Sequence, residues 1–355
     1  MGGGWADGLG RRAIVLTGDR FDDAKTAHGL LRSSPLFDLV AVVDLAAAGR
    51  RSTEVVPGGG DVPVVATVGE APGRPEVAIV GIASYGGAIP PLVRDQLRDA
   101  LRGGLDVVSG LHEPVRGDPE LAALADQMGC RVVELRAPRP FSGLRFWSGA
   151  ILDVTVPRLA VLGTDCDVGK RTTLVSLIGE LERRGRRVEM IATGQTGLLQ
   201  GARQGFVMDA VPLDFVSGLL EEAVIAAASR APDLIVVQGQ GSFRGPTGQV
   251  GPQLLAHTGV THVILHHAPA RTTYKSTPGV PLGDPAGDVA LIECYGATPL
   301  ALTLSAAGID PADRDAIGAS LGARLGLPVA WPLEDGIGAV ADLVEAEVIG
   351  RGSVS

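Results

Sequence analysis

The sequence predicts an α/β fold in two domains, and three observations support this prediction. Short runs rich in valine and isoleucine alternate with helix-like stretches, without the polar alternation of half-exposed strands. This rhythm stops at Ala137–Gly143, which contains two prolines and a glycine and is expected to be a linker, and then it starts again. The 355 residues are also more than one small core requires.

The first domain is predicted to span residues 12–150, after a disordered glycine-rich leader over residues 1–11. Its strands are expected at Ala13–Leu16, Leu39–Val43, Val62–Val65, Val77–Ile82 and Asp106–Val108. Its helices are expected at Asp22–Arg32, Pro90–Arg102 and Pro119–Met128. The last helix has Asp118 in the N-cap position and Gly129 just after its end. The alternation of strands and helices indicates a doubly wound parallel sheet.

The second domain is predicted to span residues 151–355 and repeats the same alternation. Its strands are expected at Leu159–Leu162, Val188–Ala192, Leu234–Val237, Val263–His266, Leu300–Leu304 and near Val329. Its helices are expected at Lys170–Arg184, Phe215–Ser229, Pro311–Leu325 and Gly338–Val348. A second parallel sheet follows from this order.

Composition excludes several classes of protein. The 50 glycines show no period of three, which excludes collagen, and the net charge of −9 argues against nucleic acid or an anionic membrane as a partner. Apolar runs fall short of the about 18 residues that span a bilayer. Three cysteines, at positions 130, 166 and 294, form neither a zinc pattern nor a disulfide framework. We therefore expect a cytoplasmic protein that acts on a small molecule.

A phosphate-binding loop is the strongest local signal. A buried strand leads into Gly163-Thr-Asp-Cys-Asp-Val-Gly-Lys170, and a helix follows. Glycines let backbone N–H groups turn toward an anion, and the start of a helix adds partial positive charge. Lys170 can then neutralise a phosphate. We expect phosphate contacts from Gly163, Thr164, Asp165, Cys166, Asp167, Val168, Gly169, Lys170, Arg171, Thr172 and Thr173.

The loop departs from the usual G-x-x-x-x-G-K-[ST] pattern in two ways. Five residues separate Gly163 from Gly169, and Arg171 occupies the position of the hydroxyl residue. Thr172, one place later, is the candidate Mg²⁺ ligand if Mg-ATP is bound. The loop alone does not distinguish ATP from another nucleotide such as coenzyme A. An ordinary strand-to-helix turn is the alternative.

Gln238 ends the strand that in P-loop enzymes presents an acid toward Mg²⁺. An amide supplies hydrogen bonds but no negative charge, which weakens the case for ATP hydrolysis. Gln238 remains a candidate catalytic residue, and a polar residue at a tight turn is the alternative.

Other polar residues also fall at the expected carboxyl ends of strands, where open α/β sheets bind ligands. Candidate substrate-binding residues are Gln195, Thr196, Gln240, Ser242 and Arg271. His112 is a candidate acid or base because its pKa lies near neutrality, with a buried structural role as the alternative. Asp214, with Asp209 nearby, is a further candidate catalytic acid or base, and its alternative role is to cap the following helix.

Together these motifs resemble a family first catalogued as a domain of unknown function, whose characterised type is a D-glutamate N-acetyltransferase. The similar stretches are Ala24–Arg32, Gly81–Gly87, Ser109–His112, Gly163–Cys166, Val168–Lys170, Ala192–Gly197, Asp209, Asp214–Phe215 and Gly239–Ser242. The resemblance implies a Rossmann-like N-terminal domain and a P-loop NTPase-like C-terminal domain. It also implies acetyl transfer from acetyl-CoA to an amino acid and assembly into a homo-oligomer.

The chain departs from this family at two positions. Gln238 replaces the acid of Glu-Gly-Gln-Gly-Ser, and Arg244-Gly-Pro246 stands where His-Pro is usual. The phosphate loop is also similar to that of dethiobiotin synthetases. Three hypotheses follow: an N-acyltransferase that uses acetyl-CoA or another acyl-CoA, a ligase or kinase that uses ATP with Mg²⁺ to activate a carboxylate, and a nucleotide sensor without catalysis.

Overall fold

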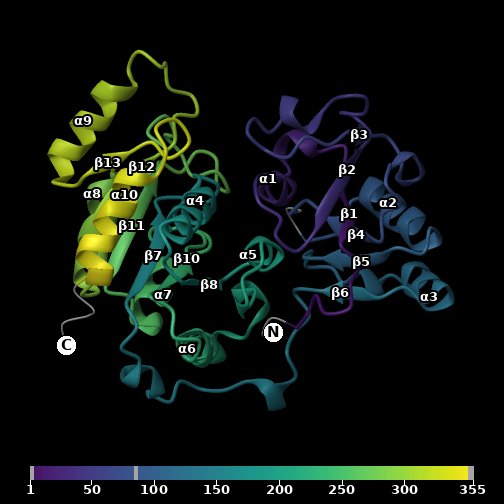
Figure 1. The fold of residues 1–355 in the computed structure, drawn as a ribbon, viewed down its shortest axis with the longest axis horizontal. Coiled ribbons are helices and arrows are strands. Elements are labelled where there is room, and N and C mark those ends of the chain that lie inside the picture. Colours follow the sequence, from purple (N-terminus) through teal and green to yellow (C-terminus); the bar gives the residue numbers. More distant parts are fainter. Residues whose placement is uncertain (1–3, 84–86, 351–355) are drawn as a thin grey trace. The chain divides into compact units, whose positions relative to one another are not determined.

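The computed structural model describes residues 4–83 and 87–350, shown as a ribbon in Figure 1. The chain divides into two compact units. The first unit runs to Gly143 and takes two later pieces, Gly194–Ala202 and Phe206–Val211. The second unit is built from the rest of the chain, starting at Leu144. Within the described ranges, no helix has both the length and the apolar character needed to cross a bilayer.

The first unit is built on a parallel sheet with the strand order β3-β2-β1-β4-β5-β6. Its strands are β1 Arg12–Gly18, β2 Asp38–Asp44, β3 Val64–Val65, β4 Val77–Val80, β5 Asp106–Ser109 and β6 Val132–Glu134. Val15 at its centre pairs with Val42 and Ile79, and all three are fully buried. Such strands need cover on both faces, which explains their continuous apolar sequence.

The described residues of the first unit form the α-helices α1 Lys25–Arg32, α2 Pro91–Arg102, α3 Pro119–Met128 and α5 Gln195–Leu199. The bounds of α3 match the prediction. The Asp118 side chain accepts hydrogen bonds from the Glu120 and Leu121 backbone N–H groups at 2.9 and 3.2 Å. Gly129 ends the helix in the left-handed conformation, with φ 68°. Both capping predictions are confirmed.

The second unit has a seven-stranded parallel sheet with the order β13-β12-β11-β7-β10-β8-β9. Its strands are β7 Arg158–Gly163, β8 Val188–Ala192, β9 Gln204–Gly205, β10 Leu234–Gln238, β11 His262–His267, β12 Thr298–Leu304 and β13 Val329–Ala330. The strand β7, which carries the phosphate loop, lies between β10 and β11. The loops after these three strands therefore emerge next to one another.

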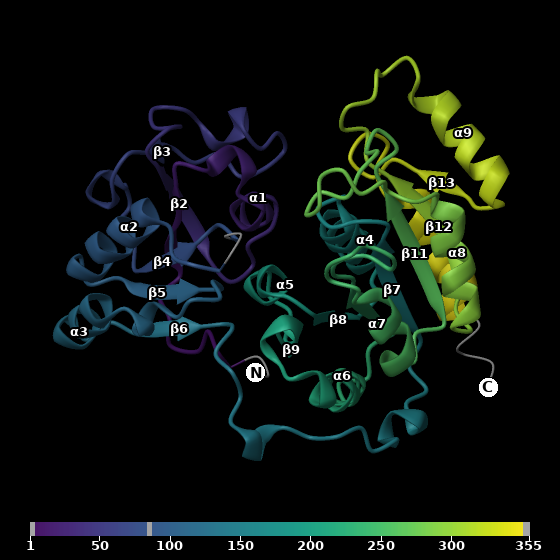
Figure 2. The same cartoon turned by 180° about the vertical axis from the view of Figure 1, so that it is seen from behind.

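The helices of the second unit are α4 Lys170–Arg183, α6 Leu213–Ala228, α7 Gly251–Thr258, α8 Pro285–Cys294, α9 Arg314–Leu325 and α10 Gly338–Leu343. A π-helical segment, Val344–Ile349, continues α10. The helix α4 packs on α10. The helix α9 lies beside β13 at the edge of the sheet, as the reverse view in Figure 2 shows. With two parallel sheets flanked by helices, the predicted α/β fold class is confirmed.

Several elements differ from the sequence prediction. The sequence pattern did not indicate β6, β9, α5, α7 or α8. The helix expected over Pro311–Leu325 begins at Arg314, because residues 311–313 form a turn. Asp214 does not cap α6: the helix begins at Leu213, its N-cap residue is Pro212, and Asp214 lies in its first turn. That capping interpretation is wrong.

The predicted leader and the segment that follows the predicted linker both contact folded structure. Residues 1–3 of the leader lie outside the described residues, and the Asp7 carbonyl accepts a hydrogen bond from Arg131 Nη1 at 2.8 Å. After the linker, Glu221 of α6 accepts hydrogen bonds from the Ser148 backbone N–H at 2.7 Å and the Ile151 backbone N–H at 3.2 Å. These bonds fix the connecting segment onto the second unit.

Candidate functional site

The phosphate loop runs from the end of β7 to the start of α4, in the strand–loop–helix order that the sequence predicts. Two of its residues have positive φ, Asp167 at 51° and Gly169 at 122°. Aspartate tolerates the left-handed region better than most residues. At Gly169 a side chain has no room, because a Cβ would lie 2.6 Å from His266 Nε2. Glycine is therefore required where α4 begins.

Lys170 joins the phosphate loop to the loop after β10. Its side chain is buried, and its Nζ donates to the Asp165 carbonyl at 2.5 Å and to the Gly241 carbonyl at 2.8 Å. The two bonds hold the ammonium group between the two loops. This arrangement places the cation at the helix start, where phosphate binding needs it.

Two buried histidines at the end of β11 support the loop from beneath. Thr164 Oγ1 lies 3.0 Å from His267 Nδ1, and Thr173 Oγ1 lies 3.0 Å from His266 Nδ1. Burial lowers the pKa of His266 to about 3 and that of His267 to about 4. Both imidazoles are therefore neutral at pH 7 and act as fixed hydrogen-bonding groups.

The end of β10 presents two amides beside this loop. Gln238 is 6% exposed, and its Oε1 has no hydrogen-bond partner within the described part of the chain. Gln240 Oε1 is also buried and has no hydrogen-bond partner among the described residues. Ser242, in contrast, uses its Oγ to accept from the Gly245 backbone N–H at 2.9 Å. A buried polar atom without a partner is costly in a folded protein, so each of the two amide oxygens can accept a hydrogen bond from a ligand.

The segment after β11, residues 268–283, carries two cations onto the phosphate loop. Arg271 Nη1 lies 2.8 Å from Asp165 Oδ2, and Arg271 also donates to the carbonyls of Cys166 at 2.5 Å and Asp167 at 3.1 Å. Lys275 Nζ lies 3.1 Å from Asp167 Oδ2. We call this segment the cationic arm. Arg271 is thus part of the loop's surroundings and not a solvated surface residue.

A second charged cluster lies in the first unit and contains His112, Asp209 and Arg136. His112 Nε2 is 3.7 Å from Asp209 Oδ2, and Asp209 Oδ1 forms an ion pair with Arg136 Nη1. The side chains of His112 and Asp209 are 54% and 40% exposed, whereas that of Arg136 is 12% exposed. Gly87 packs against His112, since a Cβ there would lie 3.0 Å from the histidine Cβ. The imidazole is therefore positioned and accessible to solvent.

Gln195 and Thr196 occupy the start of α5 in the first unit. Gln195 Oε1 accepts from Arg136 Nε at 3.1 Å, and Thr196 Oγ1 lies 3.0 Å from Thr26 Oγ1. Both residues are buried. These bonds give them a positioning role toward Arg136 and α1. Their predicted contact with substrate stays a prediction, as does the catalytic role of Asp214, which is exposed in the second unit.

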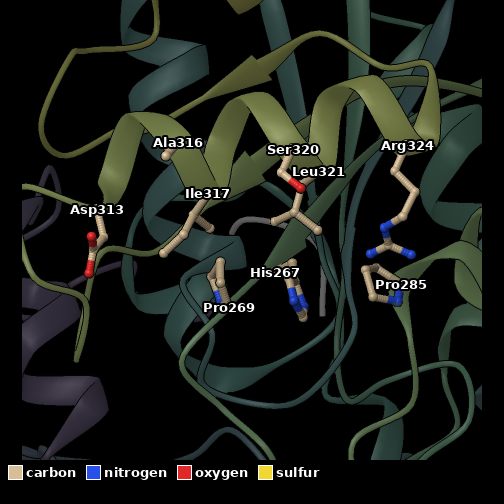
Figure 3. Close-up of a pocket in the computed structure, with 9 residues that line it drawn as sticks. All are labelled: His267, Pro269, Pro285, Asp313, Ala316, Ile317, Ser320, Leu321 and Arg324. Carbon is tan, nitrogen blue, oxygen red and sulfur yellow. The ribbon is translucent and has the colours of Figure 1, made fainter.

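An open groove of about 480 Å³ lies between α9 and the carboxyl end of β11 (Figure 3). Figure 3 shows Ile317, Leu321 and Arg324 pointing from α9 toward His267. The lining residues are His267, Pro269, Pro285, Asp313, Ala316, Ile317, Ser320, Leu321 and Arg324. His267 also forms a hydrogen bond with Thr164, so one residue both lines the groove and contacts the phosphate loop.

Arg244, one of the two departures from the resembled family, forms an ion pair with a buried carboxylate. Its Nε and Nη2 lie 3.0 and 2.9 Å from the two carboxylate oxygens of Asp288. Asp288 is 1% exposed and lies on α8. The pair fixes the loop after β10 to α8. Arg244 therefore has a structural role beside the site.

The fold and these contacts define the class: a two-domain α/β protein with a Rossmann-like unit and a P-loop unit. More particularly, the chain belongs to the DUF1611 family, a domain of unknown function. The model of its P-loop domain matches residues 145–341, and that of its Rossmann-like N-terminal domain matches residues 45–138.

Relatives carry more specific names. The chain is 30% identical over 275 residues to a D-glutamate N-acetyltransferase of Tritonibacter scottomollicae, covering 76% of this chain and 80% of that protein. It is 31% identical over 193 residues to one of a Pseudoalteromonas species, covering 53% and 52%. A crystal structure of a DUF1611 family protein from Anabaena variabilis aligns with a TM-score of 0.87 at 30% identity, covering 95% of this chain and all of that one.

Sequence reasoning missed two residues of these clusters. Arg136 directly precedes the proline-rich break and has no periodic or motif signal. Lys275 offered one weak signal, because the chain has only three lysines and a second one, Lys170, lies in the phosphate loop. Both clusters depend on contacts between residues far apart in sequence, which a single sequence does not display.

Proposed function

We propose that this protein is an N-acetyltransferase that transfers an acetyl group from acetyl-CoA to the amino group of an amino acid, with D-glutamate as the first acceptor to test. The observation that carries the proposal is the pair of relatives with this name at 30% and 31% identity, the first aligned over 76% of the chain. The phosphate loop with its lysine fits a donor that contains phosphates.

Coenzyme A would be held by the loop through its phosphates. Lys170 would supply charge, and the backbone N–H groups at the start of α4 would supply hydrogen bonds. These residues fit the group because the lysine is already placed at the helix start between two loops. Acetyl-CoA supplies a thioester, from which an amine displaces the thiolate.

His112 is the proposed general base for the acceptor amine. It would take the proton that the nitrogen loses as the N–C bond forms and the C–S bond breaks, and the departing thiolate would be protonated to free CoA. Asp209 would orient the imidazole, and Arg136 would hold Asp209. The exposure of His112 supports this role, because a base must reach its substrate.

The groove under α9 is the proposed place for the adenosine end of CoA. Its volume of about 480 Å³ lies within the range of small-molecule sites. It is lined by apolar side chains from α9 together with Arg324, and its His267 bonds the phosphate loop. A ligand anchored on the loop would therefore reach an apolar surface for its heterocycle.

Release of free CoA thiol tests the activity. The purified full chain is incubated with acetyl-CoA and D-glutamate, L-glutamate or a panel of other amino acids, and the acetylated product is identified by mass. We expect acceptor-dependent thiol release. Absence of release with every acceptor would overturn the proposal, and acceptor-dependent ADP formation from ATP would favour a carboxylate-activating ligase instead, which the dethiobiotin synthetase-like loop leaves as the second candidate.

Filling the groove tests the placement of adenosine. Ala316→Trp puts a large side chain into the groove, whereas Ala319→Trp changes an exposed residue of the same helix that does not line it. We expect the first variant to weaken CoA binding by about tenfold or more, comparable to the loss of one good apolar contact. Binding of inorganic pyrophosphate should not change. Equal effects of both variants on CoA would contradict the placement.

A further inference from the structure

The cationic arm has an ordered shape of its own. The Tyr274 backbone N–H donates to the Val280 carbonyl at 3.0 Å, and that of Leu282 donates to the Thr272 carbonyl at 2.8 Å. Tyr274 is buried, 5% exposed. These bonds make the arm a short hairpin, which holds Arg271 and Lys275 in place.

The arm neutralises the two carboxylates of the phosphate loop. Asp165 Oδ2 lies 2.8 Å from Arg271 Nη1 and accepts a hydrogen bond from the Lys275 backbone N–H at 2.9 Å. Asp167 Oδ2 lies 3.1 Å from Lys275 Nζ. Within the loop itself, these two negative charges balance Lys170 and Arg171. The excess positive charge that a phosphate requires therefore comes from the arm.

The residues at the usual magnesium position do not fit Mg²⁺. This ion prefers carboxylate and hydroxyl oxygens in octahedral geometry. Arg171 occupies the position of the hydroxyl, and the Thr173 hydroxyl faces His266 Nδ1 at 3.0 Å. Thr172, the candidate ligand from the sequence, lies on α4 one place beyond the usual hydroxyl position. At the end of β10, where P-loop enzymes usually have an acid, this chain has Gln238, which carries no charge. No group of three or more His, Cys, Asp or Glu suited to a metal occurs across residues 4–83 and 87–350.

We propose that the cationic arm replaces the divalent cation, so that a phosphate-bearing ligand binds this loop without Mg²⁺, with Lys170, Arg271 and Lys275 as its counter-charges. The buried, unpartnered Oε1 of Gln238 is consistent with a hydrogen-bonding contact in place of a metal-ligating one. The inference rests on the proposed function only for the choice of CoA as the main probe.

Calorimetric titration of the full chain tests the inference. CoA, ATP and inorganic pyrophosphate are each titrated in EDTA and in excess Mg²⁺. We expect the tightest probe to bind equally well in both buffers. Binding that disappears in EDTA would overturn the inference, and so would failure of all three probes to bind in either buffer.

Variants assign the effect to the arm. Lys275→Gln should weaken binding by about tenfold, the usual size of a lost charge-assisted contact. Lys275→Arg should restore most of the affinity. Arg187→Gln removes the same charge from an ion pair with Asp233 at the amino end of β8 and should have no effect. Unchanged affinity in Lys275→Gln would overturn the role of the arm.

A charge restored at Gln238 gives an independent readout. Gln238→Glu places a carboxylate where P-loop enzymes use one, so binding should become weaker in EDTA and recover in Mg²⁺. The outcomes separate the two proposals. Metal-independent binding of ATP without binding of CoA would refute the proposed function alone, whereas acetyl transfer that requires Mg²⁺ would refute the inference alone.

Discussion

The two units use charged and titratable residues in opposite ways. In the first unit, His112 and Asp209 lie 3.7 Å apart with about half of each side chain exposed. In the second unit, His266 and His267 are buried beneath the phosphate loop, and Asp288 is paired with Arg244 at 1% exposure. An exposed imidazole can exchange protons with a substrate, whereas a buried neutral one can only hold a neighbour in place. The comparison separates residues suited to chemistry from residues that support the site.

Removal of the exposed imidazole is expected to have the largest effect. His112→Asn should lower kcat for acetyl transfer by about 100-fold or more, because general-base catalysis contributes about 10²–10⁴-fold. The affinity for CoA and the melting temperature should be unchanged, since the side chain is exposed and belongs to no core. Steady-state kinetics and calorimetry measure both quantities.

A matched substitution elsewhere provides the control for His112. His257→Asn changes a histidine in the last turn of α7 that belongs to neither cluster, and it should retain full activity. Asp209→Asn should lower kcat by less than His112→Asn, because Asp209 acts through the histidine. If His112→Asn retained kcat, the division of roles between the units would be wrong.

Breaking the ion pair between Arg244 and the buried Asp288 should lower the stability of the fold without lowering kcat. Arg244→Met leaves Asp288 buried without its partner, and loss of one member of such a pair costs about 3–5 kcal/mol of unfolding free energy. Thermal unfolding should show a clearly lower melting temperature. The double variant with Asp288→Leu should recover much of the loss, because the uncompensated buried charge is gone.

The partly exposed ion pair between Arg136 and Asp209 in the first unit provides the comparison for Arg244 and Asp288. Asp209→Asn should change the melting temperature little, since partly exposed pairs contribute only about 0–1 kcal/mol. Equal losses of stability from Arg244→Met and Asp209→Asn would remove the distinction between a supporting and a reactive charge.

The buried histidines predict that stability depends on pH. Burial lowers the pKa of His266 to about 3 and that of His267 to about 4. The unfolded chain takes up these protons below about pH 6.5, whereas the folded chain does so only near the lowered values. The unfolded state therefore binds more protons in this window, and stability falls as the pH decreases from about 6.5 to about 4, by up to about 1.4 kcal/mol per pH unit for each histidine.

Thermal unfolding across this window measures the effect. His266→Gln should make the dependence shallower, because one of the two titrating groups is removed. A slope that is identical in the variant would show that His266 does not contribute.

The sequence predicted the buried parallel strands and the phosphate loop well, because both depend on local patterns. Val188–Ala192 and Pro119–Met128 have the predicted bounds, and Lys170 begins α4 as expected. The pattern missed α8, whose apolar residues are not gathered on one face, and α5, which has only five residues. Short or non-amphipathic helices give no periodic signal.

The charged clusters could be predicted only in part. His112 and Arg271 were candidates because each follows a predicted strand. Their partners lie outside the predicted elements: Arg136 directly precedes the predicted linker, and Lys275 lies in a loop. They contact Asp209 and Asp167 only through the tertiary fold. The spacing of residues along one sequence does not show which distant residues come into contact in the fold. Asp214, a further candidate in the sequence, is exposed, and its catalytic role stays a prediction.

The later pieces of the first unit have a consequence for biosynthesis. Gln200 Nε2 donates to the Gly29 carbonyl at 2.8 Å, so α5 completes a unit whose other strands and helices precede Gly143. Chains generally begin to fold from the N-terminus during translation. Here the ribosome must first add β7, α4 and β8 before residues 194–211 emerge and close the earlier unit. A nascent chain that stalls at Gly143 would expose the surface that α5 covers. The N-terminal part of this protein therefore needs residues 194–211 to finish folding.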